Sequence, residues 1–209
     1  MKNIIDIYNS YGIPERLQMH MLRVAACSKV IIKNWNGEKL DVEMLYRVLL
    51  LHDMGNLVKI PENECDNQKF RRKRAYYYSV FGNDDHAVSL QIGKELGLSE
   101  KELRIMEDKV FVNNEYILSC DSYETKIGAY CDQRVSPDGV LSLLERLNQA
   151  KIRYKNKPNS SMNNPRTDYL IECAVKIEKQ VMNFCLIRPD EINDASISTY
   201  IEQFKNYQL

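Results

Sequence analysis

The chain contains three histidines, and one of them, His52, stands directly before an acid, Asp53. Both follow a mostly apolar run, residues 45–51, of the kind that is normally buried. A buried carboxylate is costly unless a positive group or several donors meet it. Two interpretations are open for this pair alone. It is either a structural pair at a helix end stopped by Gly55, or part of a site for a divalent cation, which imidazole and carboxylate both bind.

The composition sets the class of protein in which this pair lies. The 209 residues include 29 Lys+Arg and 29 Asp+Glu, so no global field attracts nucleic acid or an anionic membrane. No apolar stretch approaches the roughly eighteen residues of a membrane span, and residues 1–6 do not resemble a signal peptide. We therefore expect one cytoplasmic domain with no membrane partner, and nucleic acid is disfavoured as a ligand.

The periodicity predicts an all-α fold, because apolar residues recur at i, i+3, i+4 and i+7 along most of the chain. Helix-capping residues mark several starts. We expect helices after Pro14, Asp41, residues 83–85 and Ser99, a helix over about 115–132 with an irregularity near Gly128, one from about 141, and two over about 166–186 and 190–206.

These helices place the candidate ligands. His20 lies on the apolar stripe of the first long helix, His52 lies late in the next, and His86 lies in the first turn of a later helix. Asp132 shares an inward face near the end of the helix that begins at about 115. A lone core histidine is usually structural, but three of three on inward positions, with two acids, favour a metal site.

The order of His20, His52, Asp53 and Asp132 resembles that of the HD-domain metal-dependent phosphohydrolase superfamily. LLLHDMGN (49–56) is similar to the motif that names the family, and YCDQRVSPDGVLSLLERL (130–147) resembles the segment that carries the last ligand in small bacterial and archaeal members. The resemblance covers residues 17–147. It implies a multi-helix HD-domain bundle over residues 1–150, with the metal site between core helices, and a C-terminal helical extension, residues 151–209, packed on the same domain.

The resemblance also implies a chemistry. His20, His52, Asp53 and Asp132 would bind one divalent cation, Mn, Ni, Co, Fe or Zn, with Mg also suitable, that activates a water. Asp53 would also accept a proton from that water. The expected reaction is hydrolysis of a small phosphorylated metabolite, above all a nucleotide phosphomonoester or a related phosphoester.

His86 corresponds to a family histidine that binds a second metal or contacts the phosphate. The family's dinuclear members carry another histidine downstream, where residues 112–114 offer only asparagines beside a valine. We therefore expect one metal, with His86 as a catalytic and substrate-binding residue near the phosphate. The structural alternative is a histidine that pairs with Asp84 or Asp85.

Cationic side chains offer further phosphate contacts. Lys59 and the run 71–74, with Arg71 and Arg72 as predicted substrate contacts, follow the motif, although a solvated basic face is the commoner meaning of such a run. Arg134, two residues past the last ligand, is the preferred single catalytic candidate. It either holds that ligand or touches the substrate.

Three features leave alternatives open. Asn56 replaces a lysine that often follows the motif glycine, which favours a non-catalytic metal- or nucleotide-binding regulatory module as the second interpretation. Residues 71–74 with Tyr76, Tyr77 and Tyr78 suggest single-stranded nucleic acid as a weaker third, but we expect these tyrosines to pack, with at most one in a pocket. The helices after Pro165 either cover the core or form a homodimer face.

Overall fold

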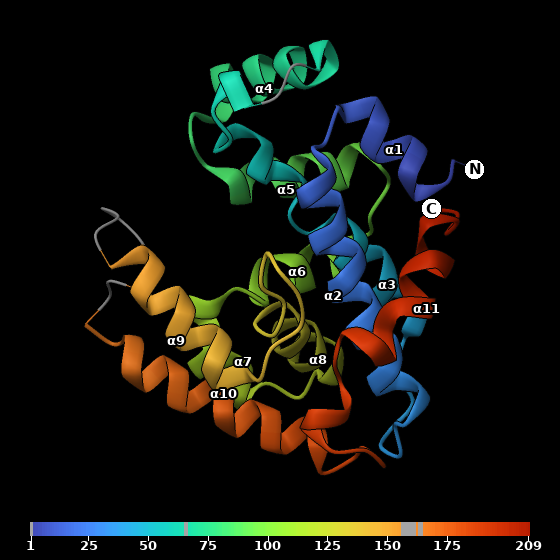
Figure 1. Cartoon of the computed structure of the whole chain (residues 1–209), viewed down its shortest axis with the longest axis vertical. Coiled ribbons are helices and arrows are strands. Elements are labelled where there is room, and N and C mark those ends of the chain that lie inside the picture. Colours follow the sequence, from blue (N-terminus) through green and yellow to red (C-terminus); the bar gives the residue numbers. More distant parts are fainter. Residues whose placement is uncertain (1, 65–66, 156–161, 163–164) are drawn as a thin grey trace.

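Helices account for the regular structure of the chain (Figure 1). The computed structural model describes residues 2–64, 67–155, 162 and 165–209, and these contain no strand, only three isolated β-bridges. The all-α prediction is confirmed. The elements are α1 (Ile4–Tyr11), α2 (Glu15–Lys33), α3 (Val42–Leu51), η1 (Met54–Val58), η2 (Glu62–Glu64), α4 (Gln68–Phe81), α5 (Asp85–Glu95), α6 (Glu100–Asp108), η3 (Phe111–Asn113), α7 (Asn114–Ser119), α8 (Tyr123–Asp132), α9 (Leu143–Tyr154), α10 (Thr167–Met182), η5 (Pro189–Glu191) and α11 (Asp194–Lys205).

Side-chain caps start three of these helices where the sequence predicts them. The Asp41 carboxylate accepts a hydrogen bond from the Met44 N–H and so begins α3, and Asp84 caps α5 in the same way. Ser99 and Glu102 form the predicted capping box of α6. These caps are local in sequence, which is why the pattern alone identifies them.

Other boundaries differ from the prediction. The expected helix over 115–132 is two helices, because α7 ends at Ser119 and Ser122 caps the start of α8. Gly128, where an irregularity was expected, lies inside the regular α8. The basic run 71–74 and the tyrosines after it lie inside one helix of 14 residues, α4, which is not among the helices expected above. A helix that the sequence analysis missed, α1, is capped by Asn3.

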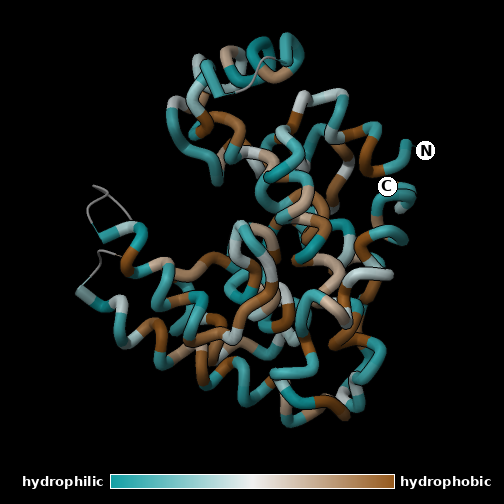
Figure 2. The backbone as a smooth tube through the Cα atoms, viewed as in Figure 1, coloured by the Kyte–Doolittle hydropathy of each residue, from teal (hydrophilic) through white to brown (hydrophobic). Residues whose placement is uncertain are grey.

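A single hydrophobic core joins the early and late parts of the chain. Helix α2 packs against α3, α8 and α11, and core residues as far apart as Val24, Leu49, Ile177 and Phe204 belong to one cluster. Figure 2 shows hydrophobic segments gathered between the helices. The predicted boundary after residue 150 falls inside α9, so it does not mark a break in the fold.

The two ends of the chain lie side by side (Figure 1). Asn3 forms an isolated antiparallel bridge with Gln208, and the Ile4 N–H donates to the Tyr207 carbonyl oxygen. None of the described helices is both long enough and apolar enough to cross a bilayer.

Candidate metal centre

Three helices bring the four predicted ligands together. His20 projects from α2, His52 is the C-terminal cap of α3, Asp53 follows it, and Asp132 is the last residue of α8. The His20 Nε2 lies 3.2 Å from Asp132 Oδ1 and 3.4 Å from Asp53 Oδ2. The His52 Nε2 lies 3.4 Å from the same Asp132 oxygen and 3.6 Å from Asp53 Oδ1. Residues far apart in the sequence therefore converge on one point.

The environment of His52 defines which of its nitrogens is free. Its Nδ1 lies 2.7 Å from the Leu49 carbonyl oxygen, which can only accept, so Nδ1 carries the proton. The buried Nε2 has no hydrogen-bond partner among the described residues, and its nearest charged neighbours are carboxylates. A neutral imidazole would point a lone pair at two carboxylates there. A cation between them removes this conflict, and a backbone carbonyl behind the other nitrogen is typical of metal-bound histidine.

The spacing of the donor atoms fits a single ion. Metal–nitrogen and metal–oxygen bonds of about 2.1 Å, at angles between octahedral and tetrahedral, separate neighbouring donor atoms by about 3 to 3.5 Å. The four ion-pair distances of the cluster run from 3.2 to 3.6 Å. Within the described part of the chain, His20, His52 and Asp53 form a group whose donor atoms all lie within 4.8 Å of one another, and Asp132 is outside this group but contacts both of its histidines. Two imidazoles and two carboxylates suit several transition metals.

The electrostatics of the cluster also favour positive charge. Burial lowers the pKa of His20, but hydrogen bonds and charge from Asp132 and Asp53 outweigh this effect and raise that pKa to about 9. Burial raises the pKa of both carboxyl groups, but neighbouring basic side chains outweigh this effect and lower both pKa values below their usual range, His52 acting first on Asp53 and Lys109 on Asp132. Both carboxylates are therefore ionised at neutral pH.

Lys109 also belongs to the candidate centre, although the sequence analysis did not identify it. Its side chain is 3% exposed, and its ammonium lies 2.8 Å from Asp132 Oδ2, the oxygen that does not face the histidines. This contact neutralises part of the charge of Asp132 and orients its other oxygen toward His20 and His52. A single lysine after α6 gives no signal in the sequence, because only the packing of α6 against α8 brings it to Asp132.

Gly55 has a role different from the predicted helix stop, because α3 already ends at Leu51. A Cβ at this position would overlap the Asp85 carbonyl oxygen and the Ser89 backbone nitrogen. The Gly55 N–H also donates to the Ser89 hydroxyl, over 2.9 Å. The glycine therefore allows η1, which follows Asp53 directly, to lie against the first turns of α5.

His86 lies in the first turn of α5, the helix that packs against η1. The structural alternative for His86 lacks its partners, since Asp84 caps the Ala87 N–H and Asp85 pairs with Lys59. No contact of the His86 imidazole is found among the described residues, and His86 lies outside the group of close ligand atoms. Lys59, which was predicted to contact the substrate, is instead paired with Asp85.

Arg134 has a structural role in place of the predicted catalytic one. Its guanidinium donates to the carbonyl oxygens of Leu141, Pro189 and Ile192, and to the Tyr130 hydroxyl. The side chain is 3% exposed. These hydrogen bonds use four of the five guanidinium N–H donors and tie the end of α8 to the segment before α11, so the side chain is directed away from the histidine cluster.

Arg71 and Arg72 lie on α4, where both are exposed. Arg72 lines a pocket between α4 and α1 and not the histidine cluster. Of the three tyrosines that follow, only Tyr77 is buried, and Tyr76 and Tyr78 are 58% and 48% exposed. Tyr77 therefore packs in the core, whereas Tyr76 contacts the Tyr77 ring and Tyr78 lies under Arg74 at the surface.

Asn114 belongs to residues 112–114, which the resemblance described above compares with the region of a further histidine in dinuclear HD-domain proteins. It is fully buried and exchanges two hydrogen bonds, of 3.0 and 2.9 Å, with Gln133, the neighbour of Asp132. A third hydrogen bond joins Asn114 to the Leu170 carbonyl oxygen in α10. The amide pair thus supports the end of α8 and is not available to a second metal.

Comparisons with protein-family models, with curated proteins and with solved structures gave no match. The interpretation of this centre therefore depends on its own geometry and on the motif order.

Proposed function

We propose that the chain is a metal-dependent phosphohydrolase of the HD-domain type. It would hold one divalent transition metal through His20, His52, Asp53 and Asp132, and hydrolyse a small phosphorylated metabolite, above all a nucleotide phosphomonoester. The observation that carries the proposal is the buried Nε2 of His52, which faces two carboxylates and has no hydrogen-bond partner among the described residues. A catalytically useful cation explains both this atom and the pair of ionised acids beside it.

The ion and the residues around it would have different roles in the reaction. When bound, the ion would supply Lewis acidity, which lowers the pKa of an attacking water and draws charge from a phosphoryl oxygen. Asp53 is the most exposed of the four side chains, at 30%, so it can both bind the ion and accept the proton of the water. His86, uncommitted in the first turn of α5, would contact the phosphate. Lys109 would position Asp132.

Elemental analysis of protein purified without a metal-affinity resin tests the metal. We expect about one transition-metal ion per chain, and loss of that ion in Asp53→Ala and in His52→Ala. Asp121→Ala, which removes an exposed acid between α7 and α8, is the matched control and should keep the ion. A wild-type protein that remains metal-free after incubation with Mn, Fe, Co, Ni and Zn salts would refute the centre.

A screen of phosphorylated compounds then tests the reaction. Phosphate release should fall by about 100-fold or more in Asp53→Ala, as the loss of a metal ligand and proton acceptor requires. His86→Ala should keep the ion and still lose turnover. If His86→Ala retains full activity on the best substrate, the role assigned to this histidine is wrong.

One observation favours a second candidate, a regulatory module that binds a metal and a nucleotide without turnover. Arg134 is committed to backbone carbonyls and Lys59 to Asp85, and Arg72 lines a different pocket. Among the predicted phosphate contacts, this leaves His86 as the main candidate. Thermal stabilisation by a nucleotide, with no phosphate release under any of the metals tested, would select the module over the enzyme.

A further inference from the structure

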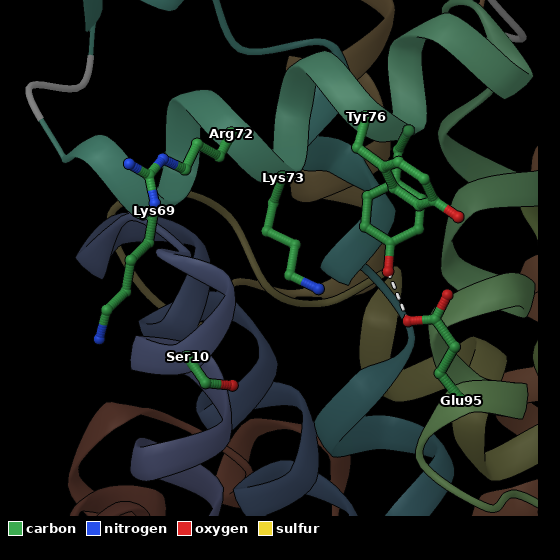
Figure 3. Close-up of a pocket in the computed structure, with 7 residues that line it drawn as sticks. Ser10, Lys69, Arg72, Lys73, Tyr76 and Glu95 are labelled. Carbon is green, nitrogen blue, oxygen red and sulfur yellow. Dashed lines mark hydrogen bonds between the residues drawn. The ribbon is translucent and has the colours of Figure 1, made fainter.

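A pocket between α4 and α1 lies apart from the histidine cluster. Its volume is about 460 Å³, within the range of small-molecule sites. Helix α4 provides one wall, α1 another, and Glu95 at the end of α5 the floor (Figure 3). The close contact of α5 with η1 is at Asp85, ten residues earlier along the same helix, which corresponds to about 15 Å. A ligand in this pocket would therefore not touch the cluster.

Three cations from one face of α4 line this pocket. Lys69, Arg72 and Lys73 are spaced at i, i+3 and i+4, so they project on the same side, and Figure 3 shows them along the α4 wall. Neither Lys69 nor Arg72 has an acidic partner within residues 2–64, 67–155, 162 and 165–209. The one acidic side chain of the lining, Glu95, leaves the pocket with an excess of positive charge. This field selects an anion.

The pocket also presents an aromatic face. Tyr76 lines it and is 58% exposed, so one side of its ring is open to a ligand. Its ring contacts the Tyr77 ring edge-on, with centroids 5.1 Å apart, and this contact supports it from below. A flat ligand ring can stack on the open face of Tyr76 while the cations bind its charged groups.

The floor of the pocket is fixed by a hydrogen-bond network. Glu95 Oε2 accepts from the Tyr77 hydroxyl at 2.6 Å and from the Tyr11 hydroxyl at 3.1 Å. The Lys73 ammonium lies over the Tyr11 ring, 4.4 Å from its centroid. These contacts join α1, α4 and α5, so the shape does not depend on a bound ligand. A rigid floor distinguishes this site from an ordinary solvated basic face.

We propose that this pocket binds a nucleoside diphosphate or a similar nucleotide, at a site separate from the metal centre. Lys69 and Arg72 bind the phosphates, and the base stacks on Tyr76. The volume of this open pocket is in the range that holds one nucleotide. This inference does not depend on the proposed phosphohydrolase activity, because none of its residues belongs to the histidine cluster.

Isothermal titration calorimetry of the full chain in excess EDTA tests the proposal with ADP, GDP, CDP and UDP, and with pyrophosphate as the charge-only probe. At least one nucleotide should bind with a Kd below about 1 mM, and about fivefold or more tighter than pyrophosphate, since the base adds a stacking contact. If none of the four nucleotides binds, or if pyrophosphate binds equally well, the proposal is overturned.

Matched variants locate the binding. Lys69→Glu should weaken it by about tenfold or more and Tyr76→Ala by about fivefold or more, whereas Lys101→Glu and Tyr78→Ala, equally exposed but outside the pocket, should stay within about twofold. All four residues are exposed, so the variants should fold, which circular dichroism checks. Equal effects of a pocket variant and its control would overturn the assignment.

Two further measurements separate this site from its rivals. Asp53→Ala disrupts the metal centre but should leave nucleotide binding in EDTA unchanged, and loss of binding in this variant would move the nucleotide to the cluster. An oligothymidylate tests a single strand as the occupant. If it binds more tightly than every nucleotide, with a steep salt dependence that Lys69→Glu reduces, the small-molecule assignment is wrong.

Discussion

Replacing Lys109 by methionine removes the positive charge that lies against Asp132 and keeps most of the side-chain volume. At 2.8 Å and an effective dielectric constant of about 20, the two charges attract each other by about 6 kcal/mol before desolvation is subtracted. Because Asp132 is 24% exposed, water offsets part of the loss. We expect the free energy of unfolding in excess EDTA to fall by about 3 kcal/mol, as for other broken buried pairs.

The same substitution should matter less in metal-loaded protein. An ion bound by Asp132 supplies the missing positive charge, so the loss in Lys109→Met should shrink to about 1 kcal/mol. By linkage, the difference of about 2 kcal/mol appears as a gain in metal affinity of about 30-fold. Urea denaturation with and without saturating metal, followed by circular dichroism, measures both free energies.

Lys126→Met is the matched control. Lys126 is also buried, at 5% exposure, but its ammonium lies over the Tyr123 ring and has no acidic partner in the described chain. Its substitution should change stability equally with and without metal. If Lys109→Met behaves in the same way, or loses no more stability in EDTA than the control does, Lys109 does not neutralise Asp132 and the reasoning fails.

Three further predictions follow from the contacts of the centre. The pKa of His20 is raised from 6.5 to about 9, so the contribution of its charged form to stability is complete below pH 6.5 and is lost as the pH rises through 9. The free energy of unfolding, measured in EDTA, should fall over this interval. If it does not fall, the environment assigned to His20 is wrong. Gly55→Ala should lower the free energy of unfolding by about 3 kcal/mol and abolish metal binding, because the added Cβ overlaps the backbone of α5. The control is Gly128→Ala, whose Cβ would make only ordinary contacts, and urea denaturation should show it to be neutral or stabilising. Arg134→Met should lower the free energy of unfolding by about 3 kcal/mol, because it leaves backbone carbonyls without a donor. The folded fraction of this variant should keep a turnover within a few-fold of the wild-type value. A variant that is fully stable but inactive would restore the catalytic interpretation.

Much of the fold follows from local patterns in the sequence. Caps such as Asp41 and Ser99 accept hydrogen bonds from backbone N–H groups within three residues, so these helix starts can be predicted without knowledge of tertiary contacts. The break between α7 and α8 depends on Ser122, which the broader apolar periodicity obscured. Gly128 does not interrupt α8 as the sequence predicted, because a glycine inside a helix is tolerated where its neighbours pack normally.

The sequence alone determined the residue types of the candidate centre, since His20, His52, Asp53 and Asp132 are identified by chemistry and order. Only the tertiary structure decided what surrounds them. Lys109 reaches Asp132 through the packing of α6 on α8, and an isolated lysine carries no signal of this. Conversely, Arg134 lies two residues from the candidate ligand Asp132 but donates to backbone carbonyls. Neighbours in sequence on a helix point in different directions, and partners across helices depend on packing register, which local patterns do not encode.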